Sequence, residues 1–264
     1  MSEKHFPAVI VAGIDGSQAA LEAARWAADE AVRRSVRLRL VYATKPTHPS
    51  ADDYYADVHR GQAALAAATA ACEAADVPAV VESAMVSGPP GHALIEESDG
   101  AAMICVGSVG IGRYARSVLG STAIELAEKA HCPTAIIRGR DDLPPVDIHW
   151  IIFAIKDSGD ESVTAQAMSE ARLRHAPVLA LGNRGSAFDI EVDALKRRYP
   201  DVRLYPVSDN ADVAQFLREH DEPVQLAVIS ADDSDQLPQI LGPFGHHAFH
   251  LFRHATSSAL VVPA

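Results

Sequence analysis

The sequence predicts an α/β fold made of two tandem copies of one parallel-sheet domain. Short apolar runs alternate with segments of helical periodicity along the 264 residues, which is typical of parallel strands joined by helices. A charged segment with two prolines, RDDLPPVD (140–147), interrupts this alternation near the middle and suits a linker. After it the pattern repeats: Glu170, Ala171 and Arg174 stand 140 positions after Glu30, Ala31 and Arg34. We therefore predict domains at 1–140 and 149–264, with a linker at 141–148.

In the first half, the apolar run AVIVAGI indicates a strand over 8–14. The next helix is expected over 17–34, because Ser17 is a plausible N-cap and Leu21, Ala24 and Ala28 follow helical spacing. Further strands are expected at 37–43, 79–86, 102–106 and 134–138, and further helices at 57–76, 91–98 and 121–130.

The second half shows the same order with weaker signals. HWIIFAI (149–155) is expected to be its first strand, and SEARLRHAPVLAL (169–181) parallels DEAVRRSVRLRLV (29–41). Its later strands are expected at 201–207, 224–230 and 258–263. Each half therefore predicts a five-stranded unit.

Composition excludes several classes of function. The chain has 35 acidic and 23 basic residues, a net charge of −12, which argues against nucleic acid as the main partner. No apolar run reaches the roughly 20 residues of a membrane helix, and MSEKHFPAVIV lacks the pattern of a signal peptide. We expect a cytoplasmic protein.

The three cysteines are Cys72, Cys105 and Cys132. They are far apart and odd in number, so we expect neither a zinc site nor a disulfide framework. Burial as small apolar residues and a redox-sensing role both remain open.

The clearest motif is GSVGIGRYARSVLGST (107–122), which follows the apolar run AAMICV. It has the form G-x2-G-x9-G-S, with Gly107, Gly110, Gly120 and Ser121. Glycines after a strand allow backbone amides to approach a ligand, and a Gly-Ser pair that opens a helix offers free N–H groups to an anion. The motif therefore predicts a phosphate-binding loop. It is neither a dinucleotide-fold fingerprint nor a Walker loop.

This spacing resembles the ATP-binding motif of universal stress proteins. VIVAGIDGS (9–17) and AHCPTAIIR (130–138) also resemble segments of that family, and the three occur in the family's order. The match runs from Met1 to about Arg140, and the second half resembles a decayed copy, as in the tandem proteins of actinobacteria. The resemblance implies Rossmann-like domains with strand order 3-2-1-4-5 that bind ATP, with Mg²⁺ as a possible companion.

By resemblance, the region of Asp15 would hold adenine and ribose, Ala43 would line the adenine slot, and the glycine loop would hold the phosphates. Asp15 and Gly107 follow neighbouring strands at the point where the strand order reverses, where ligands bind in such sheets. The candidate residues are Gly13, Ile14, Asp15, Ala43, Gly107, Ser108, Val109, Gly110, Ile111, Gly112, Arg113, Gly120, Ser121 and Thr122.

Some of these residues have a second interpretation. Asp15 precedes Gly16, and Asp-Gly is a common turn pair, so its carboxylate could serve a turn instead of a nucleotide. Arg113 and Arg116 could neutralise phosphates or be solvated loop charges. Val109 stands where the family often has a basic or polar residue, but at a variable position.

The second half lacks the motif. GIDGS (13–17) becomes AIKDS (154–158), so Lys156 replaces the acid unless Asp157 has taken over its role. GSVG (107–110) becomes SADD (230–233), and Pro243 replaces Ser121 and removes an amide donor. We predict no nucleotide there, since acids would repel phosphate. The expected role of this half is to pair with the first within one chain; the chain could also form a homodimer.

His246, His250 and His254 are predicted on one helix face, one turn apart, beside His247. A polar face, a shared metal and a pH-sensitive surface all remain possible.

The leading hypothesis is an ATP-binding regulator or sensor in a stress or dormancy response such as hypoxia, in which nucleotide occupancy sets the 108–119 loop. A slow Mg²⁺-dependent ATPase or phosphotransfer enzyme and a nucleotide-free scaffold are the alternatives, and AMP or a cyclic nucleotide could replace ATP. We find no catalytic constellation in the sequence.

We expect Gly107→Asp or Asp15→Ala to abolish binding without loss of the fold, and replacement of Asp233 to leave binding unchanged.

Overall fold

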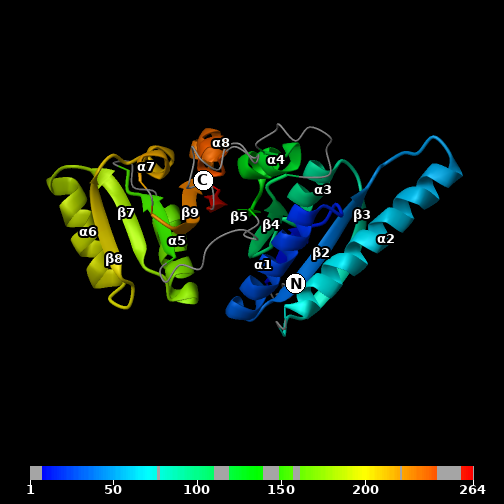
Figure 1. Cartoon of the computed structure of the whole chain (residues 1–264), viewed down its shortest axis with the longest axis horizontal. Coiled ribbons are helices and arrows are strands. Elements are labelled where there is room, and N and C mark those ends of the chain that lie inside the picture. The colour runs from blue at the N-terminus through cyan, green and yellow to red at the C-terminus, as the bar shows by residue number, and fades with distance from the viewer. Residues whose placement is uncertain are drawn as a thin grey trace, which may run out of the picture. The chain divides into compact units, whose positions relative to one another are not determined.

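The computed structural model describes residues 8–75, 78–109, 119–138, 149–156, 161–220, 222–242 and 257–263. The chain forms two compact units, one with strands β1 to β5 and one with strands β6 to β10 (Figure 1). The linker predicted at 141–148 lies outside the described residues.

The first unit is a parallel sheet in the order β3-β2-β1-β4-β5, as the family resemblance implied. Because the strand order reverses between β1 and β4, right-handed crossovers place α1 and α2 on one face and α3 and α4 on the other. The elements in chain order are β1 (Val9–Gly13), α1 (Gln18–Arg34), β2 (Arg37–Thr44), α2 (Ala51–Ala74), β3 (Val81–Ser87), α3 (Pro90–Glu97), β4 (Met103–Gly107), α4 (Ser121–Lys129) and β5 (Thr134–Ile137).

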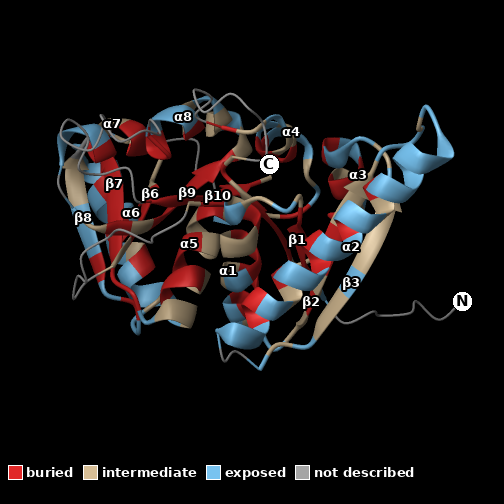
Figure 2. Cartoon of the chain, turned by 45° about the vertical axis from the view of Figure 1, so that its right-hand side comes forward, coloured by how far each residue is buried: buried red, intermediate tan, exposed pale blue. Residues whose placement is uncertain are grey.

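The core of this unit lies around the two central strands. Ile10 and Val11 of β1 and Ile104 of β4 are fully buried, and β1 is coloured as buried in Figure 2. Helix α1 buries mainly alanines, which allow it to lie close to the sheet. Its N-cap is Ser17, as predicted, because the Ser17 hydroxyl accepts a hydrogen bond from the Ala20 amide at 3.1 Å.

Helix α2 begins six residues before its predicted start at 57, so the prediction of a longer polar loop is wrong. Ser50 is the N-cap and accepts from the Asp53 amide at 3.1 Å, while its hydroxyl donates to the Asp53 carboxylate at 2.6 Å. This reciprocal arrangement resembles a capping box. The acidic residues Asp52 and Asp53 in the first turn also favour the positive end of the helix dipole.

The second unit repeats the order, as β8-β7-β6-β9-β10, with parallel pairs throughout. Helices 186–198 and 213–219 occupy connections for which the sequence pattern gave only strands. The elements are β6 (Trp150–Ala154), α5 (Glu161–Arg174), β7 (Val178–Asn183), α6 (Ser186–Arg198), β8 (Leu204–Asp209), α7 (Val213–Glu219), β9 (Val224–Ser230), the 3₁₀ helix η1 (Ala231–Gln236), α8 (Leu237–Ile240) and β10 (Ser258–Val262).

Candidate functional site

The candidate site of the first unit is formed at the carboxyl ends of β1, β2 and β4. Gly13 is paired with Val41 of β2, and the Ile14 amide donates to the Val41 carbonyl at 2.8 Å. On the other side, Ala12 is paired with Cys105, so Gly107 ends β4 beside the residues that follow β1. This is the edge and the switch point at which open parallel sheets bind ligands.

Asp15 makes a local turn contact. Its Oδ1 accepts a hydrogen bond from the Ser17 amide at 2.8 Å, and the intervening Gly16 has a φ of 86°. The turn interpretation of the Asp-Gly pair is therefore confirmed. A nucleotide contact by the same carboxylate stays a prediction.

The two arms of the glycine loop meet at their base. The Gly120 amide donates to the Ser108 carbonyl at 2.8 Å, and the Ser108 amide donates to the Ile137 carbonyl of β5 at 2.9 Å. Gly120 is the N-cap of α4, whose first turn has no acidic residue. Ser121 is exposed and Thr122 is half-buried at the start of that helix. An anion held here would lie at the positive end of a nine-residue helix.

The inner residues of the loop, Gly110, Ile111, Gly112 and Arg113, lie outside the described residues, as does Arg116. Of the loop's first arm, Ser108 is buried and Val109 is half-buried.

Gly107 and Gly13 both stand at crowded positions, and of the two only Gly107 faces backbone. A Cβ at Gly107 would lie 2.6 Å from the carbonyl carbon of Ala19 in α1, and a Cβ at Gly13 would lie 2.7 Å from Leu94 of α3. The expectation that Gly107→Asp leaves the fold intact is wrong, because the clash is with the backbone of a helix that cannot move independently of the sheet. Loss of binding in that variant would therefore not identify a ligand contact.

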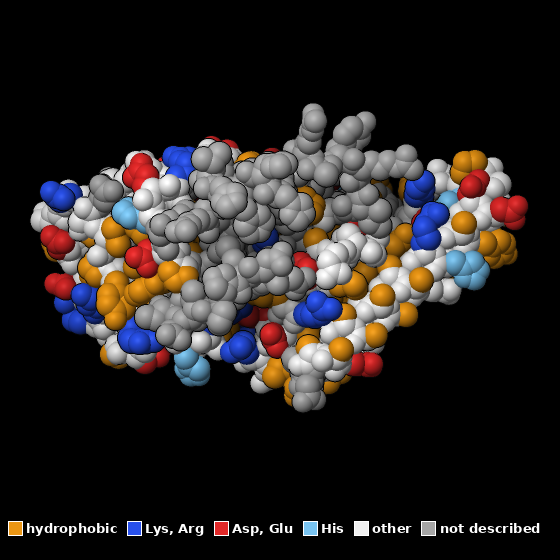
Figure 3. All heavy atoms as spheres, in the orientation of Figure 1, with side chains coloured by type: hydrophobic (Ala, Val, Ile, Leu, Met, Phe, Trp, Pro, Cys, Tyr) orange, Lys and Arg blue, Asp and Glu red, His pale blue; other side chains and the backbone are white. Residues whose placement is uncertain are grey.

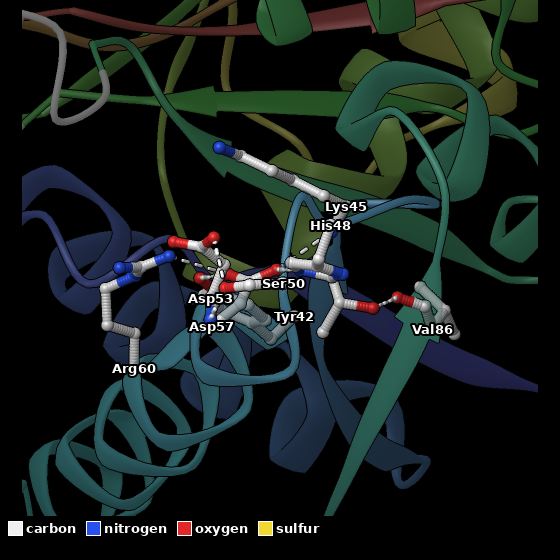
Figure 4. A network of polar contacts seen from close by, with 9 residues as sticks. Tyr42, Lys45, His48, Ser50, Asp53, Asp57, Arg60 and Val86 are labelled. Atoms are coloured by element: carbon white, nitrogen blue, oxygen red, sulfur yellow. Dashed lines mark hydrogen bonds and ion pairs between the residues drawn. The ribbon is translucent and has the colours of Figure 1, made fainter. Parts of the chain in front are cut away.

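Sequence reasoning missed a buried polar cluster just beyond Ala43 (Figure 4). Asp57 of α2 has only 5% of its side chain exposed. It accepts hydrogen bonds from the Tyr42 hydroxyl, the Lys45 amide and Arg60, and its Oδ2 lies 2.9 Å from His48 Nε2. The available signal was Ser50 with Asp53 three residues later, since a helix that begins after Ser50 places Asp57 two turns into the helix and not in a loop.

Burial by itself would raise the pKa of Asp57. The hydrogen bonds from the Lys45 amide, His48, Arg60 and Tyr42 outweigh burial and hold that pKa well below its usual range. Asp57 is therefore an ionised carboxylate inside the unit, and its charge draws four donors around it.

The corresponding edge of the second unit can be matched strand by strand. The Ile155 amide donates to the Leu181 carbonyl at 2.8 Å, as Ile14 does to Val41, so Lys156 takes the place of Asp15. Pairing of Ile151 with Leu226 and of Ile10 with Met103 makes Ser230 the counterpart of Gly107. The repeat alignment made from the sequence gives the same correspondence.

In the second unit an ion pair spans this edge. The ammonium of Lys156 contacts the carboxylate of Asp233, which stands at the position of Gly110. Gln236 donates to the same carboxylate at 3.4 Å. The Ser230 hydroxyl caps η1, so a helical turn follows β9 where a glycine loop follows β4. A small pocket remains beside the pair, with aliphatic walls that include Val163 and Val228.

Asp157, Pro243 and the four histidines at 246, 247, 250 and 254 lie outside the described residues.

The three cysteines all lie within the described residues, where they are buried and form no disulfide. Burial raises the pKa of the Cys72 thiol to about 11 and that of Cys132 to about 12. Thiols of this kind are unreactive at neutral pH, which favours the packing interpretation for these two over redox sensing.

Within the described residues, no group of three or more potential metal-ligating side chains could hold an ion. No helix in that part of the chain is both long and apolar enough to cross a membrane. On the face shown in Figure 3, the acidic and basic side chains of the described residues are interspersed and form no basic stripe.

Comparison with known proteins gives four findings. The model of the universal stress protein family matches residues 8–138. A universal stress protein of Mycobacterium tuberculosis (strain H37Rv) is 50% identical over 262 residues, which cover 96% of this chain and 95% of that protein. A universal stress protein from Archaeoglobus fulgidus has the same fold, with a TM-score of 0.70 at 11% identity over 97% of this chain and 96% of that one. A further universal stress protein, solved in complex with cAMP, is 27% identical and covers 51% of this chain and 99% of its own, with a TM-score of 0.43.

Proposed function

The chain belongs to the universal stress protein family, and from this premise we propose that its first domain binds ATP at the carboxyl edge of β1, β2 and β4. In this proposal the residues around Asp15 and Ala43 contact the adenosine moiety. The loop from Gly107 to Gly120 and the start of α4 hold the phosphates.

The observation that carries the proposal is the closure of the glycine loop. The 2.8 Å hydrogen bond from Gly120 to Ser108 brings the positive end of α4 next to the end of β4, at the strand-order reversal. The positive end of a helix and the amides of its first turn favour a phosphate group there. The ion pair of the second unit adds support: its partners replace Asp15 and Gly110, so these two positions face each other across one crevice in that copy.

The proposed role is that of a nucleotide-dependent regulator. Occupancy would set the conformation of the 108–119 loop and with it a surface that other proteins recognise, which requires that ATP bind two loop states with different affinity. The second domain, whose edge is neutralised by Lys156 and Asp233, would bind no nucleotide and would pair with the first domain within the chain. A stress or dormancy response in the cytoplasm is the setting that we propose.

The direct test is to purify the protein without added nucleotide, denature it and identify released small molecules by chromatography and mass spectrometry. We expect about one ATP per chain. Two per chain would contradict the assignment of an inactive second domain. Release of none, together with no heat of binding when ATP is titrated, would overturn the proposal in favour of a scaffold.

A second candidate function is slow ATP hydrolysis with Mg²⁺, in which Asp15 would hold the metal through water. A turnover assay separates the two, because a binding protein returns ATP intact after many hours with Mg²⁺.

A further inference from the structure

The wall of the adenine slot, whose existence rests on the proposed function, begins at the end of β2. Ala43 is the seventh residue of β2, and the chain leaves that strand at Thr44. Since Gly13 is paired with Val41, the residues from Ile14 onward lie beside Tyr42 and Ala43, about 5 Å away across the sheet. The backbone between Ala43 and Ser50 therefore borders the place where adenosine is proposed to bind.

One carboxylate, that of Asp57, contacts this backbone segment at two places. Asp57 Oδ2 accepts from the amide of Lys45 at 3.0 Å and lies 2.9 Å from the ring of His48, so it fixes the segment at two points. Its Oδ1 accepts from the Tyr42 hydroxyl at 3.2 Å, which ties the same carboxylate to β2. In Figure 4 the Tyr42 and His48 side chains converge on Asp57, while the Lys45 side chain extends away from it.

The segment is also tied to β3. The Thr44 hydroxyl donates to the Val86 carbonyl at 3.1 Å, and the Gly88 amide donates to the Thr44 carbonyl at 2.9 Å. These bonds hold the end of β2 in the sheet, but they do not reach beyond Thr44. Beyond Thr44, Asp57 holds the chain at Lys45 and at His48, and the His48 ring also packs edge-on against Tyr54 of α2.

The fold itself does not require this cluster. In the second unit the connection from β7 to α6 is only two residues, Arg184 and Gly185. At the position of Tyr42 that unit has Gly182, where a Cβ would lie 2.1 Å from the ring of Phe188. The repeat therefore closes the same edge with an apolar side chain. Burying the charge of Asp57 is costly, and the second unit forms the same fold with an apolar side chain at this place. The charge therefore points to a functional role in the first unit.

We propose that Asp57 is a positioning residue for adenine recognition: it fixes the 45–48 backbone as the wall of the slot beside Ala43. It touches no ligand atom itself. Its effect is to make the slot rigid and so to discriminate adenine from other bases, since a wall that can move accepts a base of different shape.

The test is the Asp57→Asn variant of the full chain, with Kd for ATP and for GTP measured by calorimetry. We expect ATP affinity to fall about tenfold, which corresponds to one or two weakened hydrogen bonds. The ratio of ATP to GTP affinity should fall at least about threefold. Glu82→Gln is the matched control, because Glu82 also pairs with two arginines of the sheet but lies at the amino end of β3, away from the site.

Tyr42→Phe provides a second variant if Asp57→Asn does not fold, since it keeps the charge and the other donors. Tyr42→Phe should also lower the ATP affinity and the ratio of ATP to GTP affinity. On a logarithmic scale, each decrease should be about a third to a half of that in Asp57→Asn. Unchanged ATP affinity, or equal losses for ATP and GTP, would overturn the proposal, because a purely structural role weakens both nucleotides alike. A wild-type chain that binds neither nucleotide would instead overturn the proposed function, and the inference with it.

Discussion

The two units share one strand order but treat the same edge of the sheet in opposite ways. In the first, a glycine ends β4, a loop closes through Ser108 and Gly120, and an uncapped helix start follows. In the second, Ser230 ends β9, a 3₁₀ helix follows at once, and Lys156 and Asp233 neutralise each other. The two units therefore share the edge of the sheet and differ in the residues that follow its strands.

The largest expected effect comes from placing a negative charge where phosphate is proposed to bind. Ser121→Glu keeps the fold, because Glu is favourable in the first turn of a helix. Two like charges 4 Å apart repel by about 4 kcal/mol at an effective dielectric constant of 20. We therefore expect ATP affinity to fall by about 100-fold or more, as measured by calorimetry.

Ser186→Glu is the matched control, since Ser186 is also an exposed residue that opens a helix after a glycine, but in the second unit. Equal affinities of the two variants for ATP would remove the start of α4 from the site. A loss of ATP affinity in Ser186→Glu alone would contradict the prediction that the second unit binds no nucleotide.

The next effect concerns stability. Gly107→Ala should lower the free energy of unfolding by about 2 kcal/mol, because the new methyl group meets the backbone of Ala19. Gly185→Ala should change it by less than about 0.5 kcal/mol, since a Cβ there has no neighbour within 4 Å. Thermal melting of both variants checks this contrast, and a Gly107→Ala protein as stable as the wild type would show that α1 can move away from β4.

A smaller effect follows from the lowered pKa of Asp57. A carboxylate whose pKa is depressed in the folded state stabilises fully above its unfolded pKa of about 3.9, and this contribution is lost as the pH falls below that value. The free energy of unfolding of the wild type should therefore fall more steeply below about pH 4 than that of Asp57→Asn.

Urea unfolding can be followed through Trp26 of α1 in a Trp150→Phe background, which reports on the first unit. If the free energy of unfolding of the wild type and of Asp57→Asn changed with pH in the same way, the four donors around the Asp57 carboxylate would contribute no stability on folding.

The smallest effect is expected for the second unit. Asp233→Asn breaks the pair with Lys156, whose side chain is 38% exposed, so the cost in stability should be below about 1 kcal/mol. The number of ATP molecules bound per chain should not change. A rise from one to two would show that the ion pair alone had closed a working site.

Much of the fold could be predicted from local patterns. Apolar runs located the strands within one or two residues at most ends, and Ser17 marked the start of α1 because N-cap chemistry depends only on nearby residues. The start of α2 was missed, although Ser50 and Asp53 carry a comparable signal, because the prolines and polar residues before it favoured a loop.

The sequence by itself determined the strand pattern, the doubling of the unit and the loss of the glycine motif in the second copy. These follow from residue types and spacing along the chain. Three features depend on tertiary structure: Gly107 lies directly against the backbone of Ala19, Lys156 meets Asp233, and Asp57 gathers Tyr42, Lys45 and His48. These contacts join residues 9 to 88 positions apart, and their distances depend on how strands and helices pack, which no local pattern encodes.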